Sequence, residues 1–63
     1  MNIKPRNIKS TITYRGITFY KTLGILLEEE MVEKRDMMKK DGIVVHVVRL
    51  AGVRPRTYII YRR

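Results

Sequence analysis

The stretch that most constrains the fold is residues 43–50, Ile-Val-Val-His-Val-Val-Arg-Leu, a nearly continuous apolar run. Its β-branched residues predict a strand, and the lack of alternation indicates that both faces of this strand are buried. A chain of 63 residues forms one small domain with a thin stability margin. We expect a helix to cover Val44 and Val48, which leaves Val45 and Val47 needing a cover from outside this chain. A second copy is the simplest cover, so the sequence predicts a homodimer.

Two shorter strands are expected near the N-terminus. Residues 8–15 alternate between apolar and polar side chains, which is typical of a half-buried strand. Arg15-Gly16 then separates this run from residues 17–20 and suits a two-residue hairpin turn. The predicted cross-strand pairs are Tyr14 with Ile17, Thr13 with Thr18, and Ile12 with Phe19.

A helix is expected from Thr22, as its cap, to about Lys40, with Gly42 as the C-terminal stop. At about 100° per residue, six apolar residues share the face that should pack on the sheet. They are Leu23, Leu26, Leu27, Met31, Met37 and Met38.

The rest of the chain completes an α+β domain with the order β-β-α-β-β. Residues 51–56 form a loop and residues 57–63 a closing strand. A four-stranded sheet with one helix packed on one face satisfies this order, and a β-grasp-like arrangement with both terminal strands central is one candidate. We expect residues 1–7 to be a flexible basic arm and residues 8–63 to be a single domain.

Composition excludes several classes of protein. Cysteine is absent, so no disulfide, thiolate metal site or thiol nucleophile is available. The sequence shows no apolar run of about 18 residues and no signal-peptide pattern, so the expectation is a cytoplasmic protein without a membrane partner. Abundant Lys, Arg and Glu with no Gln or Trp fit a heat-adapted source.

Charge is segregated along the chain. All six acidic residues lie between Glu28 and Asp41, whereas ten of the fourteen lysines and arginines lie outside that window. Folding should therefore collect positive charge away from the helix, on a surface suited to a polyanion. The predicted partner is DNA or RNA, bound mainly through phosphates and without catalysis.

Arginines interleaved with tyrosines supply the predicted contacts, because guanidinium groups bind phosphates bidentately and aromatic rings stack on bases. Arg54-Pro55-Arg56 is the most specific part of this pattern, because proline stiffens a loop tip that carries two guanidinium groups. The predicted nucleic-acid-binding residues are Lys4, Arg6, Lys9, Arg49, Arg54, Arg56, Tyr58, Tyr61, Arg62 and Arg63. The alternative is that the basic surface only keeps the protein soluble and that Tyr58 and Tyr61 are packing residues.

Two other functions stay open. The basic surface could bind an acidic protein partner in an assembly. A small ribonuclease would use His46, the only histidine, beside the arginines. One histidine without cysteine cannot build a usual zinc site, and no metal or cofactor is expected.

Overall fold

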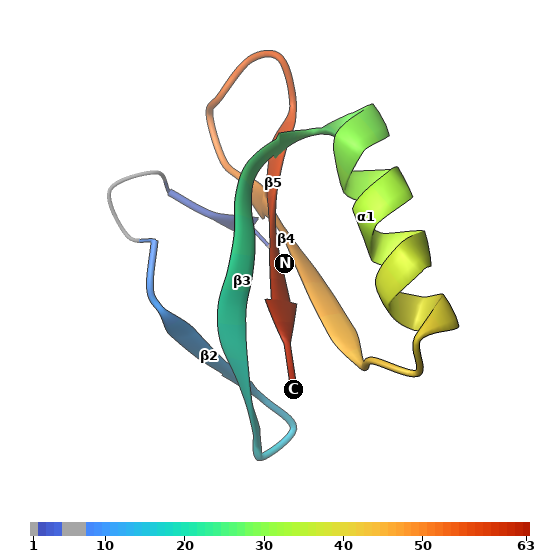
Figure 1. Cartoon of the computed structure of the whole chain (residues 1–63). Helices are drawn as coiled ribbons and strands as arrows, with labels where there is room; N and C mark the ends of the chain where they lie inside the picture. Colours follow the sequence, from blue (N-terminus) through green and yellow to red (C-terminus); the bar gives the residue numbers. More distant parts are fainter. Residues whose placement is uncertain (1, 5–7) are drawn as a thin grey trace.

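The computed structural model describes residues 2–4 and 8–63, with only the backbone of Asn2 and Ile3. Its elements follow the chain as β1 (Asn2–Ile3), β2 (Thr11–Tyr14), β3 (Ile17–Leu27), α1 (Glu28–Lys40), β4 (Val45–Leu50) and β5 (Thr57–Arg62). The α+β class predicted from the sequence is therefore confirmed. Figure 1 shows the single described helix lying along one side of the sheet.

The sheet has the order β1-β4-β5-β3-β2. Strand β1 was not predicted; it pairs in parallel with β4, while the other neighbours are antiparallel. Strand β5 is central, but β2 lies at an edge, so the order differs from the β-grasp-like candidate. Of the predicted arm over residues 1–7, Met1 and residues 5–7 lie outside the described residues.

The predicted hairpin register is confirmed pair for pair, including Tyr14 opposite Ile17 and Ile12 opposite Phe19. Arg15 and Gly16 both have positive φ, at 52° and 77°. Two central residues with positive φ give the turn whose twist matches that of the flanking strands. An arginine therefore occupies a position that more often carries Asn or Asp.

The predicted start of the helix at Thr22 is wrong, because β3 continues to Leu27 and α1 begins at Glu28. Leu23 and Leu26 instead pair with β5 across two register shifts. Pairing with β5 stabilises this segment more than a helical turn that contains Gly24 would. The N-cap residue, Leu27, provides no side-chain hydrogen bond, but Glu28, Glu29 and Glu30 place negative charge at the N-terminal end of the helix.

The predicted stop at Gly42 is confirmed. The amide of Gly42, whose φ is 76°, donates to the carbonyl of Lys39 at 3.0 Å, and the amide of Ile43 donates to Met38 at 3.0 Å. This pair of bonds is the Schellman motif, which needs the left-handed backbone that glycine adopts without strain. At 13 residues and with a polar sequence, α1 is too short and too polar to cross a membrane.

The helix packs on one face of the sheet. Met31 is buried against Tyr58 and Ile60 of β5, and Met38 packs at the margin of the same cluster. Met37 and Leu27, which were predicted to share this face, are largely exposed instead. Val45 and Val47 belong to the helix side, whereas Val48 lies on the opposite face. Val45 and Val47 thus share one face and Val48 lies on the other, as predicted, but the helix covers the face of Val45 and Val47, so the predicted helix-facing side is wrong.

The opposite face of the sheet is covered by its own curl. The ring of Tyr14 in β2 lies 4.7 Å from the ring of His46 in β4, although β3 and β5 separate those strands in the sheet order. Phe19, Val48, Leu50, Ile59 and Tyr61 fill the enclosed space. Both faces of β4 are thus covered within one chain, so this strand does not need a second copy as its cover.

Candidate nucleic-acid interface

The loop between β4 and β5, residues 51–56, brings three arginines of the sequence together. Because β4 and β5 are antiparallel neighbours, the end of β4 meets the start of β5, and Arg49 lies opposite Tyr58 in the register. Arg54 and Arg56 follow in the loop itself and are exposed. The tertiary structure thus places Arg49 beside residues five and seven positions later in the sequence.

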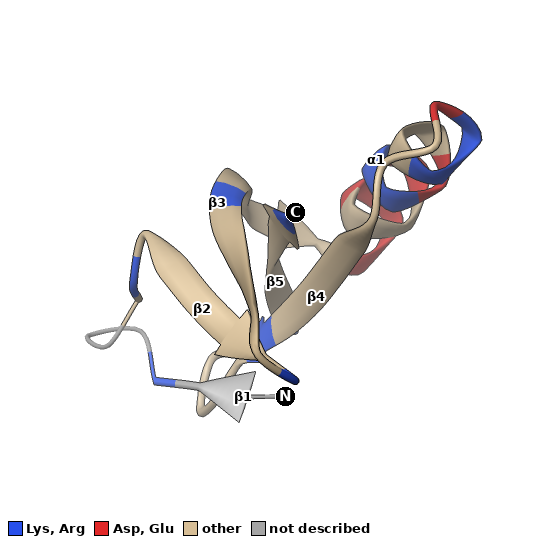
Figure 2. Cartoon of the chain, turned by 90° about the horizontal axis from the view of Figure 1, so that it is seen from below, with Lys and Arg blue, Asp and Glu red and all other residues tan. Residues whose placement is uncertain are grey.

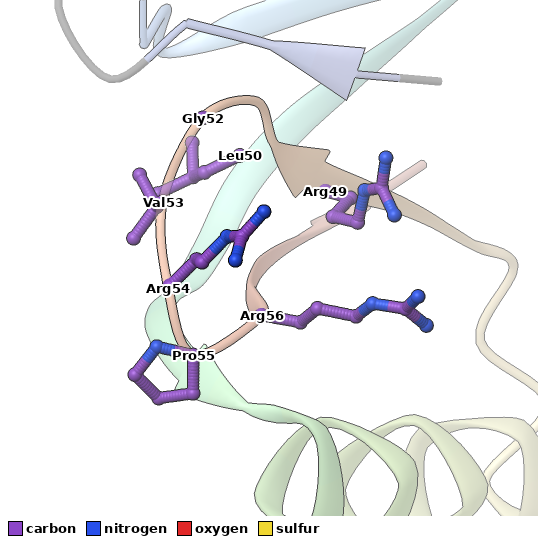
Figure 3. Close-up of a pocket in the computed structure, with 7 residues that line it drawn as sticks. All are labelled: Arg49, Leu50, Gly52, Val53, Arg54, Pro55 and Arg56. Atoms are coloured by element: carbon purple, nitrogen blue, oxygen red, sulfur yellow. The ribbon is translucent and has the colours of Figure 1, made fainter.

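These arginines line a shallow pocket of about 480 Å³. Its remaining lining residues are Leu50, Gly52, Val53 and Pro55, so no carboxylate belongs to the described lining. Figure 3 shows the side chains of Arg49, Arg54 and Arg56 extending toward the same side of the loop, while Pro55 lies on the other side. Guanidinium groups stay charged at all physiological pH values and donate in forks that match phosphate oxygens.

A second hollow, of about 560 Å³, lies between the loop and the start of α1. Leu27, Glu28, Glu29, Glu30, Pro55 and Arg56 line it. Arg56 therefore borders both hollows, with arginines on one side and the first-turn glutamates on the other. These carboxylates repel phosphates, so the hollow beside α1 is less favourable for a polyanion than the pocket lined by the arginines.

The distribution of charge over the fold agrees with this direction. Figure 2 shows acidic residues on α1 and the turn that follows it, whereas the charged residues of the sheet and its loops, in the part of the chain that the structure describes, are all basic. The segregation that the sequence shows along the chain is thus also a segregation in space.

Tyr58 and Tyr61 lie on opposite faces of β5, as their alternation predicts, but both are buried. Tyr58 is 9% exposed and its hydroxyl donates to Oε1 of Glu28 at 3.2 Å. Tyr61 is fully buried, and its hydroxyl donates to the carbonyl of Lys9 at 2.6 Å. The predicted stacking of a base on Tyr58 or Tyr61 would therefore require the core to open.

The other predicted basic residues are dispersed. Arg62 and Arg63 are exposed at the opposite end of β5 from Arg56, about 20 Å away at about 3.3 Å per residue. Figure 1 shows this separation, with the β4–β5 loop at the top and the C-terminus at the bottom. Lys4 and Lys9 are exposed, and Arg6 lies outside the described residues. The predicted basic residues therefore do not form one surface. They lie at two opposite ends of the sheet.

The exposed tyrosines, Tyr14 and Tyr20, are not among the residues predicted from the sequence to bind nucleic acid. Tyr20 is 57% exposed in β3, and Tyr14 is 40% exposed at the β2–β3 turn, where the guanidinium of Arg15 lies 5.4 Å from the centre of its ring. Alternation in the hairpin contained the signal for Tyr20, because the confirmed register places it on the threonine-rich face, away from Phe19.

His46 is half-buried between the rings of Tyr14 and Phe19, at 4.7 and 5.7 Å. Burial lowers the pKa of its imidazole below the usual value of 6.5. Its Nε2 is buried and forms no hydrogen bond with any described residue. A general acid or base must reach a bound substrate, so this enclosed ring gives the ribonuclease alternative no support.

Within the described part of the chain, no three His, Asp or Glu side chains are grouped so that they could hold a metal ion. No family model matches the sequence, and neither a curated protein nor a solved structure is significantly similar to it.

Proposed function

We propose that this protein binds nucleic acid without catalysis, through phosphate contacts made by the loop over residues 51–56 and the adjoining strand ends. The observation that supports this best is the grouping of Arg49, Arg54 and Arg56 around one pocket whose described lining includes no carboxylate. The exposed guanidinium groups of Arg54 and Arg56, on one side of the loop, can bind neighbouring phosphates along one strand, with the positive charge of Arg49 beside them.

The net charge of the chain, +8 at pH 7, adds a general attraction for polyanions. Net charge alone does not determine which surface binds a polyanion. The acidic residues of α1 make the helix unfavourable for phosphates, so the loop and the ends of the sheet are the favourable binding surfaces. Such contacts position a nucleic acid without reading its bases. We therefore expect little sequence preference from the loop.

Fluorescence anisotropy with a labelled oligonucleotide, repeated from about 50 to 200 mM salt, tests the proposal. The slope of log K against log salt should be negative, because each bound phosphate releases counterions. Arg54→Ala combined with Arg56→Ala should flatten this slope by about 1.4 to 1.8, the value for two lost contacts on single-stranded or duplex DNA.

Lys34→Ala combined with Arg35→Ala is the matched control, because it removes the same charge from α1. This variant should keep a slope close to that of the parent protein. Equal flattening in both variants would show that net charge, and not the loop, carries the binding. Failure to bind DNA and RNA at about 50 mM salt would overturn the proposal altogether.

An acidic protein partner is the second candidate, since guanidinium forks also bind carboxylates bidentately. Poly-glutamate of matched charge, used as a competitor in the same assay, separates the two candidates. Nucleic-acid binding predicts weak competition by poly-glutamate, whereas an acidic partner predicts that it displaces the oligonucleotide at equal charge concentration.

A further inference from the structure

An exposed face of the β2–β3 hairpin remains outside the site described above. In the confirmed register, Thr11 lies opposite Tyr20 and Thr13 opposite Thr18. Tyr20 also lies opposite Arg62 of β5, its neighbour on the other side. All five residues are exposed, and together they form what we call the hairpin face.

Tyr20 is unusual on this face. Its neighbour Phe19 is 4% exposed within the core, whereas Tyr20 is 57% exposed. Within the part of the chain that the structure describes, no hydrogen bond or ring contact engages the Tyr20 side chain. The ring therefore contributes little to the core and is accessible for a ligand.

The surroundings of Tyr20 suit a nucleic acid. Residues directly opposite each other in a sheet have Cβ atoms about 5 Å apart, so Tyr20 and Arg62 share one patch. The threonine hydroxyls nearby can donate hydrogen bonds, and the hairpin face contains no Asp or Glu. A guanidinium beside an aromatic ring is the pairing that binds one nucleotide by its phosphate and its base.

We infer that the hairpin face is a second contact site, where Tyr20 stacks on a base and Arg62 contacts the adjoining phosphate, so that the preferred ligand is single-stranded. The inference rests on the proposed function and specifies its ligand. A duplex keeps its bases stacked inside and cannot offer one to Tyr20, whereas the bases of a single strand are free to stack on aromatic side chains.

Three labelled ligands of equal length test this inference: oligothymidylate, an abasic oligomer with the same phosphates, and a duplex. Oligothymidylate should bind more tightly than the abasic oligomer by about 5-fold to 150-fold, which is the usual strength of one stacked base. Tyr20→Thr should remove this preference while leaving abasic binding unchanged. Threonine keeps the β propensity of the position, so the variant should fold, and thermal unfolding checks that it does.

Two controls sharpen the result. Tyr20→Phe keeps the ring and should keep the preference for oligothymidylate. Ile25→Ala removes another exposed apolar side chain of β3 and should not change this preference.

Equal binding of oligothymidylate and abasic oligomer by the parent protein would overturn the inference but leave phosphate binding intact. A preference that survives Tyr20→Thr would also overturn it. Loss of all binding, including that of the abasic oligomer, would instead contradict the proposed function and remove the basis of the inference.

Discussion

The hydroxyl of Tyr61 donates a hydrogen bond of 2.6 Å to the carbonyl of Lys9, a residue 52 positions earlier in the chain. Tyr61 lies on the curled face of the sheet, in the cluster that includes Phe19 and Val48. The bond therefore ties the segment before β2 to the central strand, and it holds the edge of the sheet over the core.

Tyr61→Phe should lower the free energy of unfolding by about 1 kcal/mol, because it deletes this hydrogen bond and preserves the packing of the ring. Oligonucleotide affinity should not change, since the ring is buried. Urea unfolding followed by circular dichroism measures the first effect and anisotropy the second. Tyr20→Phe is the control and should leave stability unchanged, because the Tyr20 hydroxyl is exposed. If the Tyr61→Phe variant folds but binds the oligonucleotide more weakly, Tyr61 contributes directly to binding and this prediction is wrong.

Gly24→Ala should destabilise the protein by about 1 to 3 kcal/mol. An added Cβ would lie 3.1 Å from Cγ1 of Ile59, and Ile59 is held in the core with almost no exposed surface. A double-mutant cycle with Ile59→Ala gives a specific test. The cost of Gly24→Ala should fall once Cγ1 is absent. If the destabilisation in the double variant equals the sum for the two single variants, the contact with Ile59 is not what disfavours a side chain at position 24.

Stability should decrease as the pH falls below about 6.5 through the folded-state pKa of His46. Burial lowers the pKa of this imidazole in the folded protein, so between the folded and unfolded pKa values the unfolded chain binds more protons. The stabilising contribution of neutral His46 is therefore complete above about 6.5 and is lost at lower pH. Thermal unfolding from pH 8 to pH 5 should show this loss in the parent protein. His46→Phe, which keeps a ring against Tyr14 and Phe19, should show a smaller loss, and an unchanged profile would contradict the assignment.

Chemical-shift mapping with oligothymidylate should perturb the amides of Arg54 and Arg56 at one end of the sheet and of Tyr20 at the other. The amides of residues 29–33 in α1 should stay nearly unchanged, because the acidic first half of the helix repels phosphates. The Arg54→Ala and Arg56→Ala double variant should lose the loop perturbations first. Perturbations concentrated on α1 would show that the helix, and not the sheet, meets the ligand.

Several local features could be predicted from the sequence because they depend on neighbouring residues alone. The hairpin register follows from period-two alternation on both sides of Arg15-Gly16, and a shift by one residue would have exposed Ile12 and Phe19. The helix stop follows from Gly42, whose positive φ is accessible without strain. The loop over residues 51–56 follows from Gly52 and Pro55 between two β-rich runs.

The start of α1 depended on a distant partner. Leu23, Leu26 and Leu27 recur at helical spacing, and the same residues fit a strand once register shifts are allowed. Only the pairing of β3 with β5, whose partner residues lie at least 30 positions away in the sequence, decided between the two structures. Local propensity gave way to tertiary context here, as it often does for short apolar segments.

The sequence by itself determined the α+β class, the hairpin register, the helix stop and the placement of every acidic residue in one segment. The tertiary structure alone decided that Tyr58 and Tyr61 are buried, that Tyr20 is exposed, and that the arginines divide between two ends of the sheet. The physical reason is that alternation tells which side chains share a face, whereas exposure depends on what covers that face. In this protein the cover is α1 on one side and the curl of the sheet on the other, and both arise from contacts between residues far apart in the chain.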